Sequence, residues 1–223
     1  MNLKLLFQAI IKFAIGLLMV GILLFLPAGT IYYWNGWLFI GLLFIPMLIL
    51  GAVLWLKAPE LLEKRLNSKE KEKEQKYVVG LSLLMFLGGF IVSALDYRFG
   101  WTHVPVVLVI IASIILLVGY GLYAEVMREN AYLSRTVEVQ KGQKVIDTGL
   151  YGIVRHPMYF AITLLFLAIP MVLGSYIGFI IFLFYPILLV KRIRNEEKIL
   201  EEGLEGYIEY KKKVKYRMIP FIW

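Results

Sequence analysis

The chain has 223 residues, of which 60% are hydrophobic, and it carries a formal net charge of +8. An apolar share this high exceeds that of an average soluble domain and favours an integral membrane protein. The absence of cysteine excludes disulfides, cysteine-ligated zinc and a thiol nucleophile, and two histidines are too few for a multi-histidine metal site. We therefore expect no metal. The positive charge comes without a nucleic-acid recognition motif and is typical of cytoplasmic loops, so we expect membrane lipids and no nucleic acid as partners.

Four apolar runs are each long enough to cross a bilayer, which takes about 20 helical residues. They are residues 5–26, 37–56, 78–95 and 104–127. The first run leads into the aromatic cluster Tyr32, Tyr33 and Trp34. Such a cluster is typical of a retained helix anchored at the membrane interface, and the run is too long for a signal peptide.

Two polar segments lie between the apolar runs. Residues 57–76 are highly charged and predict an interfacial helix followed by a solvated linker, without catalytic content. Residues 136–149 alternate apolar and polar side chains around Lys141 and Gly142, which indicates a short β-hairpin.

The last apolar region, residues 158–190, would be about 50 Å long as a straight helix, too long for one crossing. Pro170 and Gly174 interrupt it near the middle, so we predict two short helices joined by a tight turn. The predicted fold class is therefore all-α and integral to the membrane. It has about six transmembrane helices, the last two forming a short helical hairpin, and a cytoplasmic C-terminal helix.

The basic residues favour this topology. With six crossings, every lysine and arginine except Arg98 falls on one side of the membrane, and the positive-inside rule assigns that side to the cytoplasm. A model with five crossings would separate the basic residues of 191–223 from the others. We therefore expect both termini on the cytoplasmic side, with N-terminal transmembrane helices in residues 1–127 and a catalytic region in residues 128–223.

Two clusters of polar side chains accompany the hairpin. Arg155 and His156 stand at the mouth of an apolar run, where Pro157 suits the first turn of a helix. Arg192 and Glu196 are four residues apart and share one helical face. Taken singly, a capping histidine and a surface ion pair are the plainer interpretations. Because both clusters fall on the same side of the membrane, we predict a pocket there that bears cations and a carboxylate.

These residues resemble the isoprenylcysteine carboxyl methyltransferase family, including its bacterial and archaeal members. The resemblance rests on "GLY" at 149–151 and "VRHPMY" at 154–159, followed by a hairpin and the block that begins "RIRNEEKIL" at 192. That block continues with the glycine and tyrosines of "GYIEY" and ends in "YRMIP" at 216–220. The resemblance covers roughly residues 120–223.

The resemblance implies an integral-membrane enzyme that uses S-adenosyl-L-methionine, bound in a cytoplasmic pocket that the C-terminal segment closes. Carried over by position, the cofactor-binding residues are Gln143, Lys144, Val145, Ile146, His156, Pro157, Met158, Tyr159 and Glu196. Tyr151 and Arg192 match the positions that face the methyl acceptor and are the candidate catalytic residues. Two positions depart from the family: Gln143 stands where members often have histidine, and Met158 stands where the eukaryotic enzymes have a small residue.

The expected function is methylation of a carboxylate on a lipidic or isoprenylcysteine-like acceptor. A carboxylate is ionised at neutral pH, so the transfer needs alignment and no general base. Three alternatives stay open: a phospholipid N-methyltransferase, an NADPH-dependent membrane reductase of related fold, and a non-catalytic membrane protein that keeps the fold. Arg192 favours an anionic acceptor over an amine, because arginine grips a carboxylate with two parallel hydrogen bonds.

Overall fold

The computed structural model describes residues 3–67, 73–134 and 136–223, and every regular element in these ranges is a helix. The elements are α1 (Leu3–Ala28), α2 (Trp34–Lys57), α3 (Pro59–Leu66), α4 (Lys73–Phe99), α5 (Val106–Glu129), the 3-10 helix η1 (Gly149–Gly152), α6 (Pro157–Val172), α7 (Tyr176–Phe182), α8 (Tyr185–Gly203) and α9 (Tyr207–Lys213). The predicted all-α class is confirmed.

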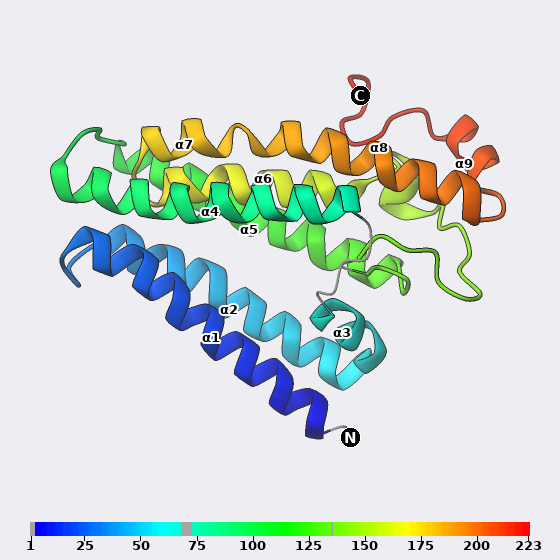
Figure 1. The fold of residues 1–223 in the computed structure, drawn as a ribbon, viewed down its shortest axis with the longest axis horizontal. Helices are drawn as coiled ribbons and strands as arrows, with labels where there is room; N and C mark the ends of the chain where they lie inside the picture. Colours follow the sequence, from blue (N-terminus) through cyan, green and yellow to red (C-terminus); the bar gives the residue numbers. More distant parts are fainter. Residues whose placement is uncertain (1–2, 68–72, 135) are drawn as a thin grey trace.

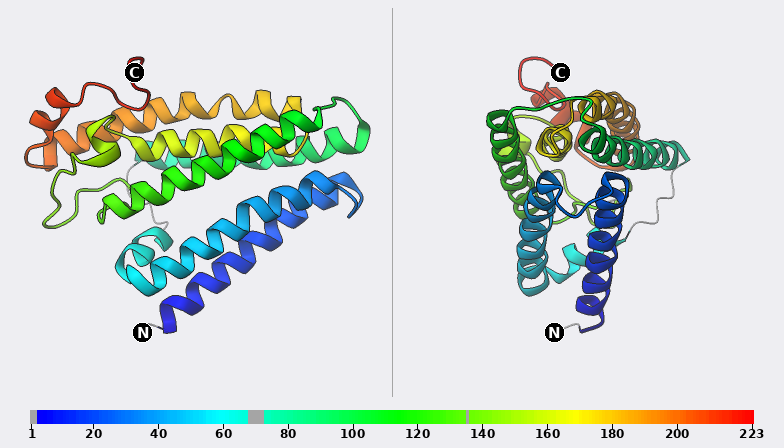
Figure 2. Two further views of the ribbon diagram at one scale, coloured as in Figure 1. Left: turned by 180° about the vertical axis from the view of Figure 1, so that it is seen from behind. Right: turned by 90° about the vertical axis from the view of Figure 1, so that its left-hand side faces the viewer.

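The long helices form two groups that meet at one end of the molecule and diverge at the other. The hairpin of α1 and α2 lies beside the bundle of α4 to α8, and α3 lies where the two groups are furthest apart (Figure 1). The view from behind agrees with this arrangement (Figure 2). The N-terminus, α3, α9 and the C-terminus share the divergent end. That end is the one on which the sequence predicts almost all of the basic residues.

In the described ranges, five helical segments are long and apolar enough to cross a membrane: α1, α2, α5, residues 75–99 of α4, and residues 176–203, which join α7 and α8. The sixth apolar helix, α6, has 16 residues, or about 24 Å of helix against about 30 Å of hydrocarbon. The protein is therefore an integral membrane protein, as predicted. The count of six crossings and the orientation in the membrane stay predictions.

The helix α6 is held tightly against α5. A Cβ added to Gly119 would lie 2.9 Å from Cγ of Leu165 and 3.2 Å from the carbonyl oxygen of Ala161, so only glycine fits there. Small residues at such contacts let two helices approach closely. Inside a membrane this close packing holds helices together, because lipid tails are as apolar as the side chains and supply no hydrophobic driving force. The α5–α6 pair consequently holds the start of α6, which carries site residues, in a defined position.

The predicted hairpin turn is present at Gly174, whose φ of +79° suits glycine. Pro170 lies inside α6 and does not end it. The second arm, however, is not the short helix that the sequence predicts. The arm consists of α7, a break at Leu183 and Phe184, and then α8, which runs as one helix to Gly203. Pro186, in the first turn of α8, explains the break, because proline fits the start of a helix but lacks a backbone donor.

The β-hairpin expected in residues 136–149 is wrong, since no strand occurs among these described residues. A turn does form at Lys141 and Gly142, closed by a hydrogen bond from the Gln143 N–H to the Gln140 carbonyl oxygen at 3.0 Å. Side-chain hydrogen bonds then take the place of the expected backbone hydrogen bonds between strands. The Gln140 N–H donates to Oε1 of Gln143 at 2.9 Å, and Nε2 of Gln140 donates to the Tyr132 carbonyl oxygen at 2.5 Å.

Side-chain hydrogen bonds join the loops at the end where the two helix groups meet. Asp96 in α4 is fully buried and accepts bonds from the N–H and the hydroxyl of Thr102, both at 2.6 Å, and from the hydroxyl of Ser175 at 2.5 Å. The Tyr33 hydroxyl donates to the Leu173 carbonyl oxygen at 2.6 Å. We call this set the Asp96 knot. It ties the α1–α2, α4–α5 and α6–α7 connections together.

Candidate functional site

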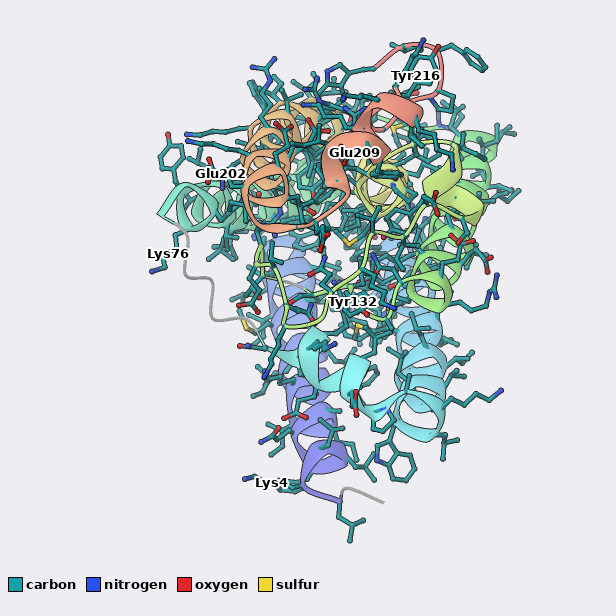
Figure 3. All side chains as sticks on the ribbon, turned by 90° about the vertical axis from the view of Figure 1, so that its right-hand side faces the viewer. Lys4, Lys76, Tyr132, Glu202, Glu209 and Tyr216 are labelled. Carbon is teal, nitrogen blue, oxygen red and sulfur yellow. The ribbon has the colours of Figure 1, made fainter. Side chains whose placement is uncertain are left out.

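A pocket opens at the divergent end, and residues between 130 and 210 line it. Figure 3 looks onto this end, where Tyr132 lies below Glu202 and Glu209. Of the residues that the sequence predicts for the site, the pocket brings together Gln143, Lys144, Val145, Ile146, Tyr151, His156, Met158, Tyr159, Arg192 and Glu196. Pro157 starts α6 and is buried beside the pocket without lining it.

A hydrogen-bonded chain of three side chains links α6 to α8 along the pocket wall. Nε of Arg192 donates to the Tyr159 hydroxyl at 2.9 Å, and that hydroxyl in turn donates to Oε2 of Glu196. The guanidinium of Arg192 also lies over the Tyr159 ring, 5.9 Å from its centroid. Arg192 and Glu196 thus share one helical face, as predicted, and Tyr159 bridges them. The chain presents a cation and a carboxylate to the same pocket.

The neighbouring carboxylate, Glu197, turns away from the pocket into a buried cluster of basic side chains. Its Oε1 accepts from Nε of Arg155 at 2.8 Å and lies 3.3 Å from Nε2 of His156. Its Oε2 accepts from Nε of Arg217 at 2.9 Å. The side chains of Glu197 and Arg155 are each only 3% exposed. Such a cluster is stable only because every charge in it has a partner.

The C-terminal segment after α9 closes this cluster from outside. Nη1 of Arg155 donates to the carbonyl oxygens of Val214 at 2.6 Å and Lys215 at 2.8 Å. The backbone N–H of Arg155 donates to the Tyr216 carbonyl oxygen at 2.9 Å, and that of His156 to the Arg217 carbonyl oxygen at 2.7 Å. Residues 214–217 therefore supply hydrogen-bond acceptors to the residues just before α6.

Tyr151 lies on η1, where hydrogen bonds fix both its side chain and its backbone. Its hydroxyl accepts from Nδ2 of Asn130 at 2.9 Å, and its carbonyl oxygen accepts from the Tyr210 hydroxyl at 2.8 Å. Burial raises the pKa of the Tyr151 phenol well above its usual value, although the bond from Asn130 opposes this. The phenol therefore stays protonated at neutral pH and is able to donate a hydrogen bond.

Gly149, at the start of η1, lies against a carboxylate from α5. Oε2 of Glu129 accepts from the Leu150 N–H at 3.0 Å. A Cβ added to Gly149 would meet Oε1 of Glu129 at 1.4 Å, and its φ of +51° also suits glycine. This close approach sets the direction in which η1 leaves the loop, and with it the position of Tyr151.

The loop between α5 and η1 covers the pocket, and α3 holds the loop in place. Nη1 of Arg65 donates to the Ser134 carbonyl oxygen at 3.0 Å, and Nζ of Lys64 donates to the Ala131 carbonyl oxygen at 3.2 Å. Nη2 of Arg65 also donates to the Tyr123 hydroxyl. The segment 57–76, predicted to be structural, thus begins with a helix that steadies one wall of the pocket.

Within the loop, Lys144 is exposed and Val145 packs into an apolar cluster. Oε1 of Gln143 is already engaged with the Gln140 N–H. This engagement limits what its side chain can offer a ligand. The residues described in the structure contain no group of three His, Cys, Asp or Glu side chains placed to hold a metal ion.

Sequence reasoning missed the buried cluster around Glu197. One signal was available, because Arg155 is expensive beside an apolar run unless a carboxylate meets it. The doublet Glu196–Glu197 offered two candidates about 100° apart around a helix, and the choice between them depends on tertiary contacts. Tyr207 and Tyr210, which also line the pocket, belong to the block "GYIEY" at 206–210, but sequence reasoning assigned them no role. Asn130, which lines the pocket as well, carried no pattern by which it could be selected.

Comparison with known proteins finds one family model and several relatives, each of which matches part of the chain. Residues 106–202 match the model of the isoprenylcysteine carboxyl methyltransferase (ICMT) family. The Delta(14)-sterol reductase TM7SF2 of Mus musculus is 32% identical over 91 residues, which cover 40% of this chain and 22% of that protein. The Delta(14)-sterol reductase of Methylotuvimicrobium alcaliphilum is 28% identical over 93 residues, with the same two coverages. The uncharacterized protein YpbQ of Bacillus subtilis is 33% identical over 93 residues, 41% of this chain and 55% of that protein.

Proposed function

Because residues 106–202 match the model of the isoprenylcysteine carboxyl methyltransferase family, we propose that the protein is a membrane methyltransferase that uses S-adenosyl-L-methionine. The acceptor that we propose is a carboxylate on a lipidic or isoprenylcysteine-like molecule. The observation that carries this proposal is the chain Arg192–Tyr159–Glu196, which presents a cation and a carboxylate to one pocket at the end of the helix bundle.

The donor set of the pocket fits this cofactor. S-adenosyl-L-methionine supplies a methyl group on a positively charged sulfur. Glu196 would hold its ammonium group, and the Tyr159 ring offers a face to which a cation is attracted. His156 and the backbone of residues 143–146 would complete the site. In this proposal Glu197 holds Arg155 and His156 in place and does not itself touch the cofactor.

Arg192 and Tyr151 would hold the methyl acceptor. Arg192 offers a planar guanidinium, which can grip a carboxylate with two parallel hydrogen bonds. Tyr151 offers a protonated phenol whose position is fixed by Asn130 and Tyr210. An acceptor carboxylate is ionised at neutral pH, so these residues need to orient and desolvate it and have no proton to remove.

We also propose that the pocket faces the cytoplasm, together with both termini. The support is the distribution of basic residues. In the sequence, every lysine and arginine except Arg98 falls on one side of the six-crossing topology. Lys4 and Lys76 lie toward the divergent end, where the pocket opens (Figure 3). In this topology residues 1–127 supply the spanning helices, and residues 128–223 supply the catalytic region.

The direct test is the binding of S-adenosyl-L-methionine and of NADPH to the detergent-purified protein, measured by calorimetry. We expect saturable binding of S-adenosyl-L-methionine and none of NADPH. Incubation with lipid extracts and cofactor labelled on the methyl group would then identify the acceptor. Binding of neither compound would contradict an enzymatic role of this kind.

A membrane reductase is the second candidate, because Delta(14)-sterol reductases are among the matching proteins. Less than a quarter of each reductase is matched, so most of each reductase has no counterpart in the alignment. NADPH binding in the same experiment would favour this candidate over the methyltransferase.

A further inference from the structure

One hydroxyl group in the pocket has a feature that the assignments above do not use. Tyr207, in the first turn of α9, is only 4% exposed and lines the pocket. Its hydroxyl oxygen is fully buried and has no hydrogen-bond partner among the residues that the structure describes. The nearby Tyr210 is different, because its hydroxyl donates to the Tyr151 carbonyl oxygen at 2.8 Å.

A buried hydroxyl without a partner is costly and uncommon in folded proteins. Burial, followed by the nearby carboxylates of Glu197 and Glu196, raises the pKa of the Tyr207 phenol. The phenol therefore stays protonated and keeps its ability to donate. A ligand in the pocket that offers an acceptor oxygen or nitrogen would satisfy it.

The pocket has two chemically different parts, and Tyr207 belongs to both. Arg192, Tyr159 and Glu196 form the charged part. The other part is an apolar cluster on α8, α9 and the loop, made of Leu204, Tyr207, Tyr210 and Val214 with Val139, Val145 and Leu200 packed against it. The Tyr207 ring joins this cluster, while the carboxylates that raise the pKa of its phenol are Glu197 and also Glu196, which belongs to the charged part.

A ligand that matches both parts has a charged end and a flat, weakly polar end, with hydroxyl groups between them. A nucleoside joined to an amino acid has this form. We propose that Tyr207 is a further cofactor-binding residue. Its hydroxyl donates a hydrogen bond to the nucleoside portion of the cofactor, and the base lies against the apolar cluster. The inference rests on the proposed function, and it fixes the orientation of the cofactor, with the amino-acid end toward Glu196.

The test compares two tyrosine-to-phenylalanine variants that differ in what the lost hydroxyl does. Tyr207→Phe should leave the melting temperature of the ligand-free protein unchanged or slightly higher, because it removes an unsatisfied buried group. Its dissociation constant for S-adenosyl-L-methionine should rise by roughly 3- to 10-fold, the usual effect of one lost hydrogen bond. The matched control, Tyr210→Phe, should instead lower the melting temperature of the ligand-free protein, because its hydroxyl has a partner within the protein.

A second probe locates the contact within the ligand. Methylthioadenosine keeps the nucleoside and the sulfur but lacks the amino-acid tail, and it can be assayed by its displacement of labelled S-adenosyl-L-methionine. Tyr207→Phe should weaken both compounds by the same factor. An effect on S-adenosyl-L-methionine alone would place the hydroxyl at the tail and overturn the nucleoside assignment.

Two further outcomes would also overturn the inference. One is an unchanged affinity of Tyr207→Phe for both compounds. The other is a melting temperature lowered as in Tyr210→Phe, which would show that the Tyr207 hydroxyl has a partner within the protein. Failure of the proposed function looks different, because the wild-type protein would then bind neither compound, and the inference would fall with it.

Discussion

Asp96 and Glu197 are buried carboxylates at opposite ends of the molecule, and the donors that meet them differ in charge. Asp96 meets uncharged donors from the connections beside it, two from Thr102 and one from Ser175. Glu197 meets three basic side chains, brought from the start of α6 and from the C-terminal segment. At the Asp96 end, the uncharged donors tie loops to one another. At the other end, the charged cluster around Glu197 borders a pocket, and the preceding residue, Glu196, lines that pocket with its own carboxylate.

Glu197→Gln should have the largest effect, because it removes the anion from three basic groups at once. The buried guanidinium of Arg155 would lose its charged partner, and breaking a buried pair in this way costs about 3–5 kcal/mol. The free energy of unfolding, measured by denaturant titration in mild detergent, should fall by that amount. A loss below about 1 kcal/mol would show that the cluster is not what holds residues 214–217.

Asp96→Asn should come next. The amide cannot accept all three hydrogen bonds that the carboxylate accepts, and a lost bond to a charged group is worth about 1.5–3 kcal/mol. We expect lower stability in the same denaturant titration and an unchanged affinity for S-adenosyl-L-methionine. A weakened affinity would mean that the two ends are energetically coupled. The Asp96 end would then contribute to ligand binding as well as to stability.

Glu196→Gln should weaken cofactor binding and leave stability nearly unchanged, the reverse of what is expected for Asp96→Asn. Loss of the charge forfeits a charge-assisted hydrogen bond to the ligand, worth about 1.5–3 kcal/mol, so cofactor affinity should fall roughly 10- to 100-fold. Stability should change little, because Glu196 is only half-buried. Isothermal calorimetry on Glu196→Gln and Glu197→Gln together separates the two carboxylates. Equal affinity in wild type and Glu196→Gln would remove Glu196 from the cofactor site.

Arg192→Lys separates the acceptor from the cofactor. Lysine keeps the charge but loses the planar two-point grip. The rate of methyl transfer should therefore fall by one to two powers of ten, about 1.4–2.8 kcal/mol in the barrier, while cofactor affinity hardly moves. Tyr159→Phe is the control, since it removes the hydroxyl that bridges Arg192 to Glu196 and keeps both charges. A folded Arg192→Lys protein that no longer binds S-adenosyl-L-methionine would show that Arg192 serves the cofactor.

The smallest effect is expected at the exposed pair of Lys213 and Asp147, whose Nζ and Oδ2 atoms lie 2.8 Å apart. The hydrogen bond from Lys213 lowers the pKa of Asp147. A lowered folded-state pKa gives stability above the unfolded value, about 3.9, that is lost as the pH falls through the folded value. Melting temperatures of Asp147→Asn and wild type should differ slightly at pH 7, and the difference should shrink as the pH falls below about 3.9 and through the folded value. A large difference at pH 7 would mean that this pair is not the solvent-screened contact its exposure implies.

Hydrophobic patterning predicted the membrane helices and the turn at Gly174 because each depends on a local signal: a long apolar run, or a glycine in a tight turn. The pairing of Arg192 with Glu196 on one face followed from helical spacing. The alternation in residues 136–149 misled, because Val139 and Val145 pack against α8 and α9 and pair with no neighbouring strand. Apolar burial on one side of an extended segment leaves the same pattern whether the partner is a strand or a helix.

The role of Glu197 could not be predicted from local pattern for a different reason. Its partners lie far along the chain in both directions, 42 residues before it at Arg155 and 20 residues after it at Arg217. No periodicity connects such positions. The unsatisfied hydroxyl of Tyr207 is still less accessible to sequence reasoning, because it is defined by the contacts that the side chain does not make.

The hydrogen bonds of residues 214–217 also impose an order on the synthesis of the protein. Every partner in the Asp96 knot has been joined to the chain once Ser175 is in place. Arg155 and His156, by contrast, wait for the carbonyl groups of residues 214–217. While the nascent chain is being inserted, the loops at one end can therefore be tied before the residues that finish the pocket exist. A ribosome that stalls between these two points would leave helices in the membrane around an unfinished site.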